Sequence, residues 1–60
     1  MIELHDTVKI VSATTHEAKM YIGVEGNVAG TSGEQCWVNV GGSYHLWIDR
    51  DCLEKVTENG

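Results

Sequence analysis

The sequence predicts a small all-β protein, a strongly bent barrel of five short strands that closes its own sheet edges. Apolar residues alternate with polar ones at a period of two over most of the chain, and β-branched or aromatic residues fill these runs. Glycine or small polar residues separate the runs at short intervals, as they do in small barrels. The expected strands are residues 7–12, 21–30, 36–40, 44–49 and, as a candidate fifth, 53–57.

The first expected strand places Val8 and Ile10 on one face, with polar residues between them. The segment that follows, residues 14–21, is rich in good helix formers, but eight residues cannot support an independent helix. We therefore expect a loop with at most one helical turn there. Thr15 would cap that turn, with Ala18 at the third helical position.

Two bends are expected further along the chain. The second expected strand, residues 21–30, contains Gly23 and Gly26, and glycine inside a strand often marks a bulge or a close approach of another backbone. These glycines fit the sharp bending that a small barrel needs. After the fourth strand, residues 49–52 predict one short helical turn, capped by Asp49, that leads into the last strand.

The loop between the third and fourth strands decides which side chains share a face. A two-residue loop leaves both faces mixed, whereas a three-residue loop, residues 41–43, gathers the apolar residues on one face. A slip of one residue inverts a strand, so we expect the register that separates the faces; a five-residue loop leaves the same faces. The resulting pairs are Val40 with Tyr44, Val38 with Leu46, Cys36 with Ile48, Asn39 with His45 and Trp37 with Trp47.

This register defines an inner and an outer face. The inner face and core are expected to comprise Val8, Ile10, Ile22, Val24, Val28, Cys36, Val38, Val40, Leu46, Ile48 and Leu53. Trp37 and Trp47 then form a cross-strand aromatic pair on the outer face. Either the N-terminal residues Ile2 and Leu4 cross and cover this pair, or the pair stays exposed with Asn39, His45 and Tyr21 nearby as a binding patch.

Several residues resemble the KOW-type motif of SH3-like barrels, in which a Val-x-Ile strand is followed by a variable loop and then Gly-x-x-Gly-x-Val. The matching positions are Val8, Ile10, Gly23, Gly26 and Val28, and the segment LWIDRDCLEKV is similar to the end of many such domains. The resemblance covers residues 6–57. It implies a single five-stranded SH3-like barrel over residues 1–60, with 1–5 and 58–60 as candidate loose ends. KOW domains bind RNA or protein, and the RNA binders carry basic loops, whereas the loop here has Lys19 alone against Glu17.

The charge of the chain bears on its partners. Four basic residues stand against nine acidic ones, a formal net charge of −5, and Arg50 is the only arginine. This balance disfavours binding to nucleic acid or to an anionic membrane, and favours a basic protein partner or none. The first residues lack the basic and apolar regions of a signal peptide, and no apolar run is long enough to span a bilayer, so we expect a cytoplasmic protein.

Metal binding and catalysis receive little support from the sequence. The available soft ligands are Cys36, Cys52, His5, His16 and His45, without a Cys-x-x-Cys or His-x-x-x-His spacing. In the expected register Cys36 points inward and His45 outward, so we expect buried free thiols, no metal and no cofactor. Asp49, Asp51 and His45 form a nominal acid–base group, but two carboxylates flanking Arg50 are typical of a solvated turn. We therefore expect no enzyme and no small-molecule substrate.

These features favour a non-catalytic protein-interaction module. We expect it to bind a protein partner, or a second copy of itself, through the outer face of the 36–49 hairpin. The binding residues on this interpretation are Trp37, Trp47, Asn39, His45 and Tyr21. Two alternatives stay open: a KOW-type domain associated with nucleic acid, and an acidic inhibitor that presents its carboxylates to the nucleic-acid site of another protein.

Overall fold

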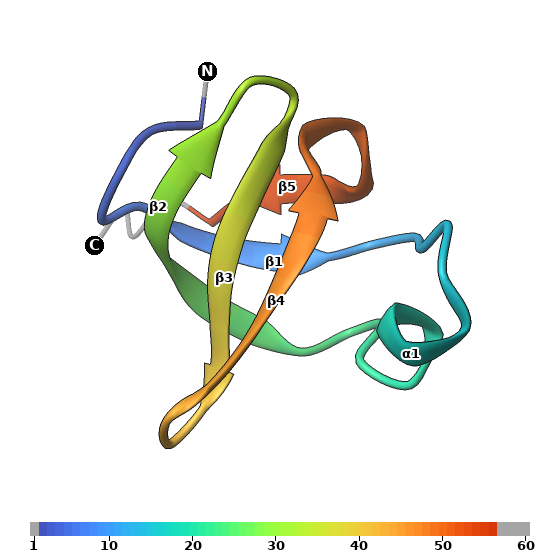
Figure 1. Cartoon of the computed structure of the whole chain (residues 1–60). Helices are drawn as coiled ribbons and strands as arrows, with labels where there is room; N and C mark the ends of the chain where they lie inside the picture. Colours follow the sequence, from blue (N-terminus) through green and yellow to red (C-terminus); the bar gives the residue numbers. More distant parts are fainter. Residues whose placement is uncertain (1, 57–60) are drawn as a thin grey trace.

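The computed structural model describes residues 2–56, which form one five-stranded antiparallel sheet in the order β4-β3-β2-β1-β5 (Figure 1). Its elements are β1 (Thr7–Ile10), α1 (His16–Lys19), β2 (Glu25–Ser32), β3 (Gln35–Gly41), β4 (Tyr44–Asp49), a 3-10 turn η1 (Arg50–Cys52) and β5 (Leu53–Lys55). The all-β class with a short helical turn before the last strand is confirmed. Residue 57 of the expected fifth strand and the candidate loose end 58–60 lie outside the described residues.

The long strand β2 organises the sheet, because it pairs with β1 through its first part and with β3 through the rest. It curves strongly between these two partners (Figure 1). β4 and β5 are the two end strands of the order, and within residues 2–56 no ladder joins them. Closure of the sheet into a barrel, which the sequence predicts, is therefore not confirmed.

The second strand begins later than the sequence predicts. The chain turns over residues 20–23, where Gly23 adopts a φ of 95° and donates its N–H to the Ile10 carbonyl, 2.7 Å away. A positive φ of this size favours glycine because it has no Cβ. The expected core role of Ile22 is wrong, since this turn leaves it 51% exposed, and Val24 is only half-buried. Gly23 thus lies in a turn just before β2, and Gly23 and Val24 both bond to Ile10, as the two residues of a glycine bulge do.

Gly26 does mark a close approach of two strands. A Cβ placed on Gly26 would lie 2.0 Å from the Asn39 carbonyl oxygen of β3. The expected cap of α1 is confirmed as well: the Thr15 side chain accepts a hydrogen bond from the Ala18 N–H at 3.1 Å. Ala18 itself is buried, which the strand pattern does not predict.

The hairpin of β3 and β4 has the expected faces, with a different loop. Its pairs include Cys36 with Ile48, Trp37 with Trp47, Val38 with Leu46 and Asn39 with His45. The expected pair of Val40 with Tyr44 is wrong, because the register shifts between Asn39 and Gly41, and Gly41 pairs with Tyr44 instead. A bulge followed by a two-residue turn over Gly42 and Ser43 therefore gives the same faces as a three-residue loop.

The turn η1 lacks the expected side-chain cap. Asp49 occupies the N-cap position, but its side chain makes no capping hydrogen bond. The carboxylate instead accepts a hydrogen bond from the Gln35 amide at 3.1 Å, across the β3–β4 pair. Arg50 leaves the strand end and donates to two carbonyls, those of Gly33 at 3.1 Å and Ile2 at 2.8 Å.

The core lies on the inner face of the sheet. Its buried cluster comprises Val8, Ile10, Val28, Cys36, Val38, Leu46, Ile48, Cys52 and Leu53. Ile2, Tyr21 and Val40 are partly buried against it. Apart from Ile22 and Val24, the residues expected in the core are thus either buried or packed against it.

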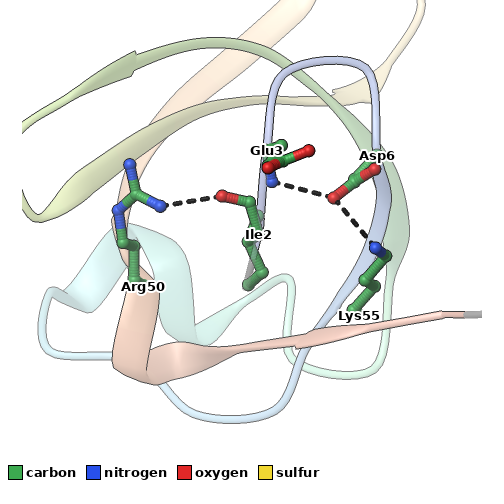
Figure 2. Close-up of polar contacts among 5 residues, drawn as sticks. All are labelled: Ile2, Glu3, Asp6, Arg50 and Lys55. Carbon is green, nitrogen blue, oxygen red and sulfur yellow. Dashed lines mark hydrogen bonds and ion pairs between the residues drawn. The ribbon is translucent and has the colours of Figure 1, made fainter.

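Residues 2–6 form a strap that is tied to the sheet at several points (Figure 2). Arg50 donates to the Ile2 carbonyl, and a single Asp6 oxygen accepts from the Glu3 N–H at 2.8 Å and lies 3.5 Å from the Lys55 ammonium. The main chain of His5 donates to the Val28 carbonyl of β2 at 2.8 Å. The strap thus holds Ile2 against the core.

Candidate protein-interaction surface

An aromatic stack covers part of the outer face of the hairpin. The rings of Trp37 and Trp47 lie with their centroids 4.9 Å apart at 41°, and the His45 ring stacks on Trp37 at 5.2 Å and 9°. Alternation along β3 and β4 places these side chains opposite the buried Cys36 and Val38. We call these three residues, Trp37, His45 and Trp47, the tryptophan face.

The N-terminal strap does not bury this face. Ile2 packs against the core cluster, and Leu4 is 49% exposed. Trp47 keeps 46% of its surface exposed, while Trp37 is half-buried within the stack. Of the two arrangements that the sequence leaves open, the structure is closer to the uncovered one, with Trp47 exposed and Trp37 half-buried.

Asn39 lies beside this face, but its polar groups serve the hairpin turn. Its Oδ1 accepts a hydrogen bond from the Gly41 N–H at 2.9 Å, and its Nδ2 donates to the Gly42 carbonyl at 3.0 Å. His45 contributes to the same turn, with Nδ1 3.0 Å from the Ser43 carbonyl. Both side chains thus fix the bulge and turn that set the register of the tryptophans.

Tyr21 does not join the tryptophan face. Its ring packs against the core cluster and lies 5.9 Å from the ring of Tyr44, at 34°. Tyr44 alternates with His45 along β4, which puts it on the inner side of the strand. The structure therefore brings together four of the five residues predicted for the site, and places Tyr21 elsewhere.

The contact of Tyr44 with α1 is a feature that the sequence does not predict. Its hydroxyl donates a hydrogen bond to the Glu17 carboxylate, 27 positions away in the chain. This hydrogen bond, followed by partial desolvation and the carboxylate charge, raises the pKa of Tyr44 above its ordinary value. No local pattern signals this contact, because it depends on where the loop before β2 returns to the sheet.

The other candidate chemistry is dispersed over the fold. Cys36 and Cys52 are free thiols buried in the core. Within the described part of the chain, no three side chains of His, Cys, Asp or Glu gather closely enough to hold a metal ion. Residues 2–56 also enclose no pocket, and none of their helices is long and apolar enough to cross a membrane.

No protein-family model, curated protein or solved structure matches this chain. The resemblance to KOW-type SH3-like barrels therefore stays a prediction. The fold and the candidate site together define a class only: a small all-β protein on one antiparallel sheet, with a partly exposed aromatic stack on its β3–β4 hairpin.

Proposed function

We propose that this chain is a small SH3-like barrel that acts as a non-catalytic protein-interaction module and binds through the tryptophan face. One observation carries the proposal: Trp47 is 46% exposed while it packs on Trp37 at 4.9 Å. A half-exposed tryptophan fixed by its neighbours offers a large apolar contact at little cost in side-chain entropy.

A protein surface is the partner class that suits this face. Tryptophan is among the residues enriched at the centres of protein interfaces, where polar side chains form the rim. Here Asn39 borders the stack and His45 is its polar member, and the orientation of both is already fixed by the hairpin turn. Stacking on single-stranded bases also uses aromatic rings, but it depends on a positively charged groove, and the chain carries nine acidic residues against four basic ones.

Affinity capture from an extract of the source organism tests this function, with wild type, Trp47→Ala and Ile22→Ala as bait. Ile22 is a matched control because it is exposed to a similar extent, 51%, on the turn before β2. We expect wild type and Ile22→Ala to recover the same protein partner. Trp47→Ala should recover at least about tenfold less of this partner, because truncation of a tryptophan at the centre of an interface has an effect of that size.

Circular dichroism of the three baits shows that each is folded before capture. Equal recovery of the partner by all three baits would contradict the proposal, because the tryptophan face would then make no contact that matters. Recovery of nucleic acid instead of protein, lost at moderate salt, would support the KOW-type alternative and contradict the proposal equally.

A further inference from the structure

β4 has a free edge beside the tryptophan face. Among residues 2–56, β4 ends the sheet order, and only its β3 side is paired. The main-chain bond from Arg50 N–H to the Glu34 carbonyl, 2.9 Å, spans the pair of Gln35 with Asp49. In an antiparallel ladder such a spanned pair is a non-hydrogen-bonded pair, and the two kinds of pair alternate.

This alternation of hydrogen-bonded and non-hydrogen-bonded pairs fixes which main-chain groups of β4 face away from β3. Leu46 and Ile48 bond to β3, whereas the N–H and C=O groups of His45, Trp47 and Asp49 point to the free edge. No backbone partner within residues 2–56 takes up these outward groups. The same alternation makes Trp37 and Trp47 a non-hydrogen-bonded pair. Side chains approach most closely at such pairs, which explains the short distance between the two indole rings.

β4 carries few of the devices that prevent edge-to-edge pairing. Natural edge strands are blunted by charged side chains, especially lysine, or by proline, a bulge or a covering segment. The sequence of Tyr44–Asp49, YHLWID, contains neither lysine nor proline, its one carboxylate, Asp49, stands at the end of the strand, and the bulge of the hairpin lies on the β3 side. Within residues 2–56 no strand pairs with this edge.

The residues of this edge are complementary to their own copy. If two β4 strands pair antiparallel about a two-fold axis at Trp47, each Trp47 lies opposite the other, and His45 of each copy lies opposite Asp49 of its partner. All three outward-facing residues then bond across the axis. An axis at Leu46 pairs His45 only with Trp47 and leaves Asp49 outside, so the axis at Trp47 is favoured.

The pairing about Trp47 also matches side-chain chemistry on the tryptophan face. An indole meets an indole at the axis, and an imidazole meets a carboxylate on either side of it. Like charges do not meet at these positions, even though each copy carries a net charge of −5.

We propose that the partner of the tryptophan face is a second copy of this chain, which pairs with β4 antiparallel about Trp47 and continues the sheet across a two-fold axis. The proposal rests on the interaction role proposed above and names the partner. A contact of one strand and one aromatic pair is small, and the net charge opposes it, so the dimer is a weak one.

Amide hydrogen exchange followed by NMR over a range of concentrations, from about 10 µM to about 1 mM, tests the pairing together with sedimentation equilibrium. We expect a monomer–dimer equilibrium. Exchange of the His45, Trp47 and Asp49 amides should slow about tenfold once about nine-tenths of the chains are paired. The amides of Leu46 and Ile48, which already bond to β3, serve as internal controls and should change little. A chain that stays monomeric, or a dimer whose three outward amides exchange as before, overturns the proposal.

A charge exchange tests the register. His45→Glu places like charges opposite each other and should weaken the dimer roughly fivefold, and the double variant His45→Glu, Asp49→Lys should restore it. Within one chain these positions are about 13 Å apart along the strand, so an ion pair inside one chain does not account for restoration. A double variant no tighter than the single one overturns this register. If the chain is monomeric while capture of another protein still depends on Trp47, this inference fails and the proposed function stands.

Discussion

At the scale of single residues, Gly26 shows how tightly β2 and β3 approach each other. A Cβ at this position would meet the Asn39 carbonyl oxygen at 2.0 Å, far inside van der Waals contact, and Val38 Cγ1 at 3.2 Å. Both neighbours belong to β3, and the side chain of Asn39 fixes the hairpin turn. Glycine is therefore required at position 26 by space, whereas Gly23 is favoured at its turn by a positive φ.

We predict that Gly26→Ala lowers the free energy of unfolding by about 3 kcal/mol, because the backbone of β2 or β3 must shift to admit the methyl group. Gly30→Ala is the matched control in the same strand, since its Cβ would meet Trp37 Cβ at an ordinary 3.6 Å. That control should change stability by less than about 0.5 kcal/mol. Urea denaturation measures both, and equal losses would show that β2 and β3 do not approach as described.

At the scale of elements, the strap of residues 2–6 is held largely by polar contacts. The Asp6 carboxylate accepts a hydrogen bond from the Glu3 N–H and forms an ion pair with the Lys55 ammonium of β5 (Figure 2). The hydrogen bond from Glu3, opposed by desolvation and assisted by Lys55, lowers the pKa of Asp6 below its ordinary value. A carboxylate with a lower pKa in the folded state stabilises that state above the pKa of the unfolded chain.

We predict that Asp6→Asn makes the stability of the fold fall less steeply as the pH is lowered. In wild type, the contribution of Asp6 is fully present above about pH 4–5 and is lost as the pH falls through its lowered folded pKa. Asp51→Asn, which removes an exposed carboxylate from η1, is the control and should flatten the profile less. Thermal denaturation between about pH 2 and pH 6 measures the difference. A profile of Asp6→Asn identical to that of wild type would contradict the role given to the Asp6 contacts.

The elements also show what the sequence can and cannot predict. The faces of β3 and β4 were predictable, because alternation is local and only one register puts Leu46 on the face of Val38 and Trp47 on the face of Trp37. The start of β2 was not, since Ile22 continues the alternation, and the turn is visible only in the bond from the Val24 N–H to the Tyr21 carbonyl and in the positive φ of Gly23. For the same reason the sequence places Tyr21 near the tryptophan face, whereas in the structure it packs against the core and lies beside Tyr44.

At the scale of the whole molecule, the core is completed without the tryptophans. Every residue buried within the described range is an aliphatic residue or a cysteine, and the largest fully buried side chains are Ile10, Val8, Val28, Val38 and Cys36. A chain of sixty residues has little apolar surface to spare. That its largest exposed aromatic, Trp47, stays outside this core is the feature on which the proposed interaction role depends.

The hairpin has a buried inner face and a tryptophan face outside the core. The free energy of unfolding of Trp47→Ala, compared with that of Val38→Ala, tests this assignment most directly. Val38 is completely buried, and its truncation leaves a cavity, so we predict a loss of about 2–4 kcal/mol. Trp47→Ala removes a cross-strand contact at the surface, so it should cost about 1–2 kcal/mol, although it removes far more atoms than Val38→Ala. If Trp47→Ala is instead the more damaging of the two, the tryptophan pair belongs to the core of the protein and the proposed surface is wrong.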